Sequence, residues 1–302
     1  MVSTCFKICL LAICSCVFSF DAHGQKIKIH IYNKTGYDLD SVVWDGNYLG
    51  HIQKDSAFVF TGIDEFITQS MVPFVVPSPF KDERVRKAFS LAVDKITRAG
   101  ELPASGFVPP GIAGFQGTDG LPFDPAQAVR LLAEAGFPAG KGFPNVIYLY
   151  SKSELNEAIA VELQNMWRDS LGVNVNLVRQ EWKVYLNSLS LLDYDIARSS
   201  WVGDYADPNT FLDMFLTGGG NNRTGWSSPG YDALLATASR ELNPSRRFEI
   251  LREAEDLLVK TAIPVCPIYY YVGIQLYDPA KLDGIRANVL DEHPLRKIRK
   301  KQ

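Results

Sequence analysis

The feature that most constrains the fold of this chain is the order of strand-like and helix-like segments in its middle part. Short apolar runs alternate with segments whose apolar residues recur every three or four positions. The order is strand, helix, strand, helix, strand, over residues 145–150, 153–172, 173–180, 182–189 and 194–201. This alternation predicts an α/β fold in which helices cover the strands and the loops after the strands face a cleft.

Further helix boundaries are predicted from capping residues. Asp82 is the expected N-cap of DERVRKAFSLAVDK, and Asp124, followed by Pro125, that of FDPAQAVRLLAEAG. Gly136 and Gly172 are expected to end two helices. A chain of 302 residues, 46% of them hydrophobic, also has enough apolar surface for a substantial core.

Residues 26 to about 72 instead alternate apolar and polar side chains, which is the period of short β-strands. The prolines of MVPFVVPSPF end this pattern, so we place a boundary between Met71 and Pro79. The sequence thus predicts a small β-rich segment over residues 25–75, followed by an α/β region over residues 76–302. Three or four strands without disulfides make a fold of marginal stability. The segment is therefore expected to be incomplete or to depend on the α/β region that follows for its stability.

Residues 1–24 have the features of a signal peptide. Lys7 supplies a positive charge, residues 8–20 form an apolar run, and residues 22–24 form a small-x-small cleavage pattern. The run is short for a membrane span. The sequence therefore predicts an exported protein, periplasmic or secreted. A lipid anchor on Cys16 is an alternative, although this cysteine lies inside the apolar run instead of ending it.

The sequence lacks the residues that several kinds of catalytic and metal-binding site require. Cys266 is the only cysteine beyond the predicted signal peptide, so no internal disulfide is expected, and its apolar neighbours indicate a buried side chain. No histidine lies between His51 and His293, which argues against a catalytic triad. HExxH and CxxC motifs are absent, and TGGGNN before Arg223 is predicted to be a loop and not a phosphate site. We expect no metal and no cofactor, and a net charge of -3 predicts no nucleic-acid partner.

The stretch SSWVGDYADPNTFL carries two carboxylates, Asp204 and Asp207, at the end of the last predicted strand. Asp207 precedes Pro208 and a helix-like run, and is most simply an N-cap. Asp204 has no such explanation, and a buried carboxylate would need a cationic partner. One alternative is an internal salt bridge with Arg198. Another is that the two carboxylates act as an acid and base pair on a sugar.

Five segments carry a resemblance to a known family. In order, they are PFKDERVRKAFSLAVDK, FVPPGI, YDIARSSWVGDYADPNTFLDMF, NNRTGWSSPGYDALLATA and IPVCPIYYYVGIQLYDP. From about Phe80 to Leu282 the chain resembles the C-terminal part of the family-5 solute-binding proteins of ABC importers, which carry oligopeptides and dipeptides. The resemblance implies a periplasmic-binding-protein-like lobe of type II, preceded by a short β-rich segment unrelated to the family.

The resemblance also implies a site and a function. In relatives the aspartate of the W-x-x-D-Y segment pairs with the α-ammonium group of the peptide; here it is Asp204, with Trp201 lining the site. The arginine of YDIARSSW, Arg198, can meet the carboxylate of a short peptide, and Tyr205 and Tyr271 are further candidate ligand-binding residues. The implied function is extracytoplasmic binding of short peptides, without catalysis, by a monomer that delivers them to the permease subunits of an ABC importer.

Two departures from the family leave alternatives open. Full-length relatives are longer, with an N-terminal lobe and an inserted domain ahead of the region seen here. The segment LNSLSLLDYD also lacks a basic pair that some relatives have near Leu189 and Ser190. The second hypothesis is therefore a truncated or hybrid product that binds no ligand and is an interaction scaffold or inactive. A glycosidase that uses Asp204 and Asp207 is the third.

Overall fold

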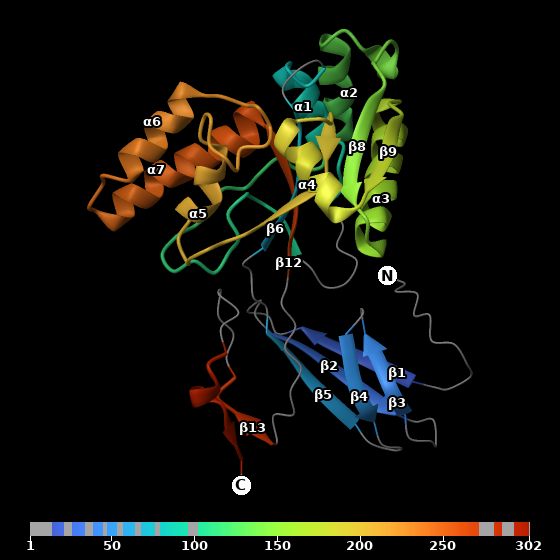
Figure 1. The fold of residues 1–302 in the computed structure, drawn as a ribbon, viewed down its shortest axis with the longest axis vertical. Helices are drawn as coiled ribbons and strands as arrows, with labels where there is room; N and C mark the ends of the chain where they lie inside the picture. The colour runs from blue at the N-terminus through green and yellow to red at the C-terminus, as the bar shows by residue number, and fades with distance from the viewer. Residues whose placement is uncertain are drawn as a thin grey trace. The chain divides into compact units, whose positions relative to one another are not determined.

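The computed structural model describes the backbone of several ranges of the chain, and within them the side chains from Gln69 onward. The ranges are 14–20, 26–33, 39–44, 47–52, 57–63, 68–75, 79–95, 102–271, 281–285 and 293–301. The chain divides into two compact units, whose elements are labelled in Figure 1. One unit comprises Met1–Phe66, Arg98–Glu101 and Val272–Gln302, and the other comprises Ile67–Thr97 and Leu102–Tyr271.

The first unit is built from antiparallel strands. A three-stranded sheet has the order β1-β2-β5, β3 pairs with β4, and β13 pairs with β14. Alternating apolar and polar residues give the longer of these segments the period of a strand. The bounds are β1 (Cys14–Phe20), β2 (Lys26–Asn33), β3 (Leu39–Trp44), β4 (Asn47–Ile52), β5 (Ala57–Ile63), β13 (Leu282–Asp283) and β14 (Arg299–Lys300).

Part of the predicted signal peptide lies in this three-stranded sheet, because β1 pairs with β2 along its whole length. Residues 1–13 and 21–25 lie outside the described residues. The signal peptide over residues 1–24 and the lipid anchor therefore stay predictions. In the part of the chain that the structure describes, no helix combines the length and the apolar character needed to cross a membrane.

The second unit contains a four-stranded antiparallel sheet in the order β11-β6-β12-β7. β6 pairs with both β11 and β12, and β12 also pairs with β7. Because β6 lies inside this sheet, the second unit begins at Ile67, whereas the sequence pattern places a boundary between Met71 and Pro79. The bounds are β6 (Thr68–Pro73), β7 (Leu102–Pro103), β11 (Ser199–Val202) and β12 (Val265–Tyr271).

A parallel sheet in the order β10-β8-β9 belongs to the same unit, and α3 and α4 connect its strands. The predicted order of strand, helix, strand, helix, strand is confirmed. The last predicted strand, residues 194–201, is split: its first part joins the parallel sheet as β10, and its second part joins the antiparallel sheet as β11. Arg198 lies between the two parts. The bounds are β8 (Val146–Ser151), α3 (Glu154–Leu171), β9 (Val175–Gln180), α4 (Trp182–Leu191) and β10 (Ile196–Ala197).

The predicted caps are present in the structure. The carboxylate of Asp82 accepts a hydrogen bond from the N–H of Arg84 ahead of α1, and that of Asp124 accepts one from the N–H of Gln127 ahead of α2. Gly172 ends α3 with a φ of 69°, which glycine adopts without strain. The other helices are α1 (Glu83–Leu91), α2 (Pro125–Glu134), α5 (Asn209–Leu212), α6 (Pro229–Ala238) and α7 (Pro244–Asp256), with 3-10 turns at Pro138–Gly140, Asp213–Phe215 and Leu295–Lys297 and a π-helical turn at Leu257–Ala262.

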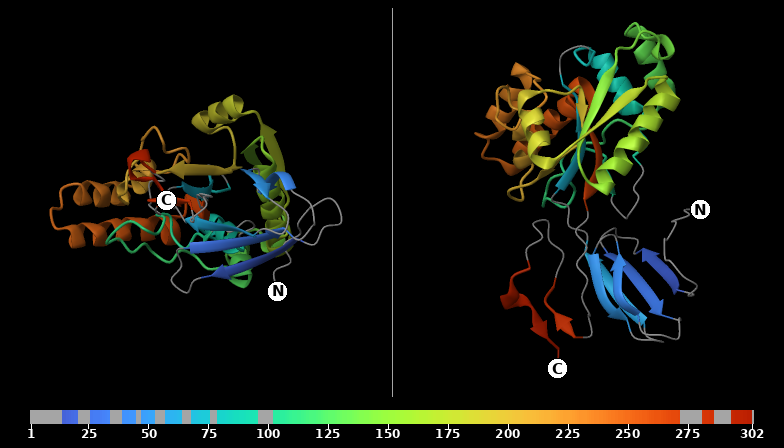
Figure 2. Two further views of the ribbon diagram at one scale, coloured as in Figure 1. Left: turned by 90° about the horizontal axis from the view of Figure 1, so that it is seen from below. Right: turned by 45° about the vertical axis from the view of Figure 1, so that its right-hand side comes forward.

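Helices cover the second unit on two sides. Figure 1 and the right-hand view of Figure 2 show α5, α6 and α7 on one side of β12, and α1, α2 and α3 on the other. Each group encloses its own cluster of buried apolar side chains, and a smaller cluster lies under α4. Two layers of helix around strands is the arrangement that the alternating sequence pattern predicts.

Aromatic packing organises the cluster under α1 and α3. The rings of Phe80 and Phe89 meet edge to face with their centroids 5.0 Å apart, and the indole N–H of Trp167 donates to the carbonyl of Phe89 at 3.0 Å. Cys266 lies in the same cluster, where its sulfur accepts a hydrogen bond from the hydroxyl of Ser90 at 3.2 Å. The prediction of a buried, unpaired cysteine is confirmed.

A buried carboxylate joins α7 to the loop between β7 and α2. Glu255 has no exposed surface; its Oε1 accepts from the N–H groups of Phe107 at 2.7 Å and Val108 at 2.8 Å, and its Oε2 accepts from Thr118 at 3.0 Å. Burial raises the pKa of Glu255 to about 7, although these three hydrogen bonds act in the opposite direction. Because buried N–H groups need acceptors, Glu255 fixes the course of the loop.

Candidate functional site

Arg198 is a buried cation at the passage from β10 to β11. The residue is 5% exposed. Its Nη2 donates to the hydroxyls of Tyr271 and, at 3.3 Å, Tyr269, and its Cζ lies 5.7 Å from the ring centroid of Tyr271. Its Nε–H is buried and has no hydrogen-bond partner among the residues that the structure describes. The backbone positions this side chain, because the N–H of Arg198 donates to the carbonyl of Leu149 in β8 at 2.8 Å.

Among the described residues, no carboxylate forms an ion pair with this guanidinium. Its hydrogen bonds go to tyrosine hydroxyls, so the alternative of an internal salt bridge between Arg198 and Asp204 is wrong. A buried charge that meets only neutral groups is costly, and an opposite charge beside it interacts strongly in a low dielectric. Arg198 is therefore suited to hold an anionic group.

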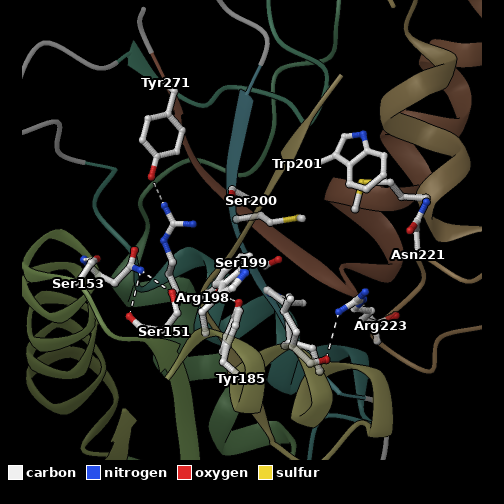
Figure 3. Close-up of a pocket in the computed structure, with 18 of the residues that line it drawn as sticks. Ser151, Ser153, Tyr185, Arg198, Ser199, Ser200, Trp201, Asn221, Arg223 and Tyr271 are labelled. Carbon is white, nitrogen blue, oxygen red and sulfur yellow. Dashed lines mark hydrogen bonds between the residues drawn. The ribbon is translucent and has the colours of Figure 1, made fainter. Parts of the chain in front are cut away.

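Arg198 opens onto a cavity of about 360 Å³ within the second unit, shown in Figure 3. Its wall comes from β6, β11, the ends of β8 and β12, the start of α3, α4, the 3-10 turn after α5 and the loop that precedes α6. Of the described residues that line it, Arg198 and Arg223 are charged, and none is an aspartate or a glutamate. A cavity of this size with two positive charges suits a small ligand that carries anionic groups.

The cavity brings together three of the predicted ligand-binding residues, Arg198, Trp201 and Tyr271. Figure 3 shows the hydroxyl of Tyr271 directed at the guanidinium of Arg198. The other two predicted residues, Asp204 and Tyr205, are not part of the cavity wall. They are exposed in the turn that follows β11. Their side chains could contact only a ligand that extends beyond the cavity.

The turn that carries Asp204 is held in place by its neighbours. The indole N–H of Trp201 donates to the carbonyl of Thr210 at 2.7 Å, and the hydroxyl of Thr210 accepts from the N–H of Asp204 at 3.0 Å. Gly203 packs directly on a ring, because a Cβ at this position would lie 2.6 Å from Cζ of Phe211. The turn therefore requires a residue without a side chain at this position.

Gly203→Ala is expected to lower the free energy of unfolding by about 2 kcal/mol, because the added methyl group overlaps the buried ring of Phe211. Urea denaturation would measure the change. Gly220→Ala is the matched control, since a Cβ at Gly220 meets no atom within 4 Å and stability should stay within about 0.5 kcal/mol. Equal stability of both variants would show that the turn does not need the close approach.

Asp207 is both a helix cap and half of an ion pair. Its carboxylate accepts from the N–H of Asn209 at 2.9 Å and pairs with Arg247 through contacts of 2.7 and 2.8 Å. Partial burial alone would raise the pKa of Asp207, but the hydrogen bonds from Arg247 and Asn209 lower it. Pro208 and not Asp207 occupies the N-cap position of α5, so the helix begins one residue later than predicted and Asp207 accepts its hydrogen bond from the position before the cap. A carboxylate held ionised in this way is unsuited to act as a general acid on a sugar.

Asp204 and Asp213 form an acidic pair that is close in sequence to residues of the cavity wall. Burial raises the pKa of Asp213, and the charge of Asp204 raises it further, so the two carboxylates lie within electrostatic reach of each other. Each is close in sequence to a residue of the cavity wall: Trp201 precedes Asp204 by three positions, and Met214 follows Asp213 directly. A cationic group near this pair would relieve the repulsion between the carboxylates.

The second arginine of the cavity was not predicted as a site residue. Arg223 follows TGGGNN, a stretch that indicates only a loop, and its one signal is that it is a lone basic residue in an otherwise uncharged segment. No pattern in the sequence indicates that this loop meets α4. Within the described ranges, no group of three or more His, Cys, Asp and Glu side chains could hold a metal ion.

The sequence matches a family model described as bacterial extracellular solute-binding proteins, family 5 Middle, over residues 46–223. The match covers more than half of the chain. It begins inside the β-rich segment over residues 25–75, so the family resemblance extends further toward the N-terminus than residue 80.

Individual relatives are similar over the same region. The periplasmic oligopeptide-binding protein OppA of Salmonella typhimurium is 36% identical over 214 residues, which are 67% of this chain and 39% of that protein. The dipeptide-binding protein DppE of Bacillus subtilis is 36% identical over 215 residues, or 66% of this chain and 39% of that protein. The chain thus spans about two fifths of the length of these relatives.

The fold is also that of solved structures of such proteins. A periplasmic oligopeptide-binding protein of an oligopeptide ABC transporter from Borrelia burgdorferi superimposes with a TM-score of 0.70 at 31% identity, covering 78% of this chain and 49% of that one. The predicted α/β lobe of the type II periplasmic-binding-protein class is confirmed.

Proposed function

The chain belongs to family 5 of the bacterial extracellular solute-binding proteins, and from that premise we propose that it binds short peptides outside the cytoplasm for delivery to an ABC importer. The relatives that it resembles are named as oligopeptide-binding and dipeptide-binding proteins, and one of them as periplasmic. The single observation that supports peptide binding best is the cavity around Arg198, in whose described wall Arg198 and Arg223 are the charged residues and none is acidic.

The cationic cavity and the acidic pair that follows β11 have charges opposite to those of the two ends of a free peptide. A short peptide carries an ammonium group at one end and a carboxylate at the other. Arg198 is buried, without an acidic partner among the described residues, and can neutralise the carboxylate. Asp204, with Asp213 near it, is placed outside the cavity wall and can attract the ammonium group.

The edge of β11 supports the same proposal. β11 is the outer strand of its sheet and pairs with β6 on one side; no described strand pairs with its other edge. Ser199, Ser200 and Trp201 of this strand line the cavity. An extended peptide can hydrogen-bond to such an edge through its main chain, which gives affinity that does not depend on its sequence.

The proposed function includes no chemical step. The thiol of Cys266 is buried, and Asp207 is held ionised by Arg247, so neither is placed to act on a ligand in the cavity. The resemblance to solute-binding proteins agrees with binding without catalysis. The proposed protein partners are the permease subunits of an importer, and the proposed active form is a monomer. An interaction scaffold that binds no peptide is the alternative, which titration with peptides distinguishes.

Asp204→Asn is expected to weaken the binding of a free tripeptide about fivefold, or about 1 kcal/mol. The effect is modest because Asp204 is exposed and Asp213 retains part of the attraction for the ammonium group. Titration calorimetry of the two proteins with trialanine measures it.

The N-acetylated tripeptide, which has no ammonium group, is the matched ligand, and its affinity should be the same for both proteins. Asp193→Asn is the matched protein control, because Asp193 is exposed and lies outside the cavity wall. If Asp204→Asn weakens the binding of trialanine and of the N-acetylated tripeptide equally, Asp204 does not recognise the ammonium group.

A further inference from the structure

Arg223 presents a second guanidinium to the cavity from a loop with a fixed course. The side-chain amide of Asn222 donates to the carbonyls of Phe215, Leu216 and Trp226 at 3.2, 3.1 and 2.9 Å. The hydroxyl of Tyr194 also donates to the carbonyl of Arg223. Because backbone groups on both sides of the loop are bonded, the position from which the Arg223 side chain extends is set by the fold and not by a ligand.

The charge of Arg223 is not neutralised within the described part of the chain. Its side chain is half-buried, and its Nη1 donates to the carbonyl of Leu186 in α4 over 3.5 Å, at the limit of a hydrogen bond. No described carboxylate lies within ion-pair distance of it. Figure 3 shows the guanidinium beside α4, separate from that of Arg198.

The positive charges of the two guanidiniums influence the same wall of the cavity. Tyr185 lines the cavity, and burial raises the pKa of its hydroxyl, whereas the charges of Arg198 and Arg223 both lower it. Apolar side chains of Leu186 and Leu189 belong to this wall. The cavity therefore has two positive positions with an apolar surface alongside them.

Two guanidiniums and one terminal carboxylate together leave a net positive charge in the cavity. A peptide with neutral side chains brings one negative charge to the cavity, which leaves one of the arginines without a counter-charge in a partly dehydrated site. A glutamate or aspartate side chain in the peptide would supply the second negative charge. The methylene groups of glutamate would also fit an apolar wall.

We propose that Arg223 is a second anion-binding position of the cavity, which pairs with the side-chain carboxylate of a bound peptide, so that the chain selects acidic peptides over neutral ones. The inference rests on the proposed function, because it assumes that a peptide occupies the cavity. In this proposal Arg198 binds the terminal carboxylate of the peptide, and Arg223 determines which peptide side chain is preferred.

Titration calorimetry with two matched tripeptides, Ala-Glu-Ala and Ala-Gln-Ala, tests the proposal. The wild-type chain is expected to bind Ala-Glu-Ala about tenfold more tightly, and the preference should shrink as salt is added, because screening weakens a half-buried pair. Arg223→Gln should remove the preference, so that the variant binds the two peptides with equal affinity. Lys183→Gln, which removes an exposed charge outside the cavity wall, should leave the preference intact.

The outcomes separate the inference from the proposed function. Equal affinities of the wild-type chain for the two peptides would overturn the role of Arg223 and leave peptide binding in place. A preference that persists in Arg223→Gln would also overturn it, since another group would then recognise the acid. If a cooperatively folded wild-type chain binds neither peptide, the proposed function is wrong and the inference falls with it.

Discussion

Arg198→Met is expected to weaken the binding of a free tripeptide at least a hundredfold, or about 3 kcal/mol. The guanidinium is buried and has no acidic partner among the described residues, so it is available to the terminal carboxylate of a ligand in a site of low dielectric. Methionine keeps most of the volume of the arginine stem and removes the charge. Titration calorimetry of the two proteins with trialanine measures the difference.

The stability of Arg198→Met distinguishes a lost contact from a lost fold. Removing a buried charge that lacks a counter-charge should leave the midpoint of thermal unfolding unchanged or raise it. Trialanine amide, which has no terminal carboxylate, is the matched ligand; the wild-type chain should bind it weakly, and the substitution should change its affinity little. A variant that binds trialanine as the wild-type chain does would exclude Arg198 as the carboxylate partner.

Glu255→Ala is expected to lower the free energy of unfolding by about 4 kcal/mol. The substitution leaves the buried N–H groups of Phe107, Val108 and Thr118 without an acceptor, and each such group costs about 1–3 kcal/mol. Urea denaturation measures the loss. Glu253→Ala, on the exposed side of the same helix, is the control and should change stability by less than about 0.5 kcal/mol. A small loss of stability for both variants would mean that water or another group accepts the hydrogen bonds of the three N–H groups in the loop.

The cost of Glu255→Ala should also depend on pH. The pKa of this carboxyl rises from an ordinary value of 4.5 to about 7 in the folded chain, mainly because of burial. A raised carboxyl pKa means that the folded state binds the proton more tightly, so this contribution is fully present below about pH 4.5 and is lost as the pH rises through 7. The substitution should therefore cost more at pH 5 than at pH 8. A cost that is equal at the two values would contradict the raised pKa.

Features that depend on neighbours in the sequence were predictable. Asp82 and Asp124 cap helices as their positions indicate, and Gly172 ends α3 with a positive φ, because each of these contacts lies within three or four residues. The apolar period likewise predicts the alternation of strands and helices around α3 and α4.

Features that depend on pairing between distant segments were not predictable. Residues 194–201 have the composition of one strand, but the first part pairs with β8 and the second with β6. This change from one sheet to the other directs Arg198 toward Tyr271. No local sequence pattern indicates where the change occurs. In the same way, Thr68–Pro73 continues the pattern of the β-rich segment, although its partners are β11 and β12 of the second unit.

The candidate site was predictable in part for the same reason. The resemblance in YDIARSSWVGDY pointed to Arg198 and Trp201, which the structure places in one cavity. The capping signal before Pro208 identified the role of Asp207, but its second partner, Arg247, is 40 residues away in sequence. Arg223 reaches α4 only because the loop before α6 folds back, and a loop without regular structure has no period from which this could be inferred.

The central claim is that this chain binds peptides in the cavity around Arg198, and titration calorimetry with a pool of di- to pentapeptides tests it most directly. The full 302-residue chain is used after a thermal scan has shown cooperative unfolding. We predict saturable heat for one site per chain, which Arg198→Met removes. Cooperative unfolding of the wild-type chain without saturable heat from any peptide would contradict the claim.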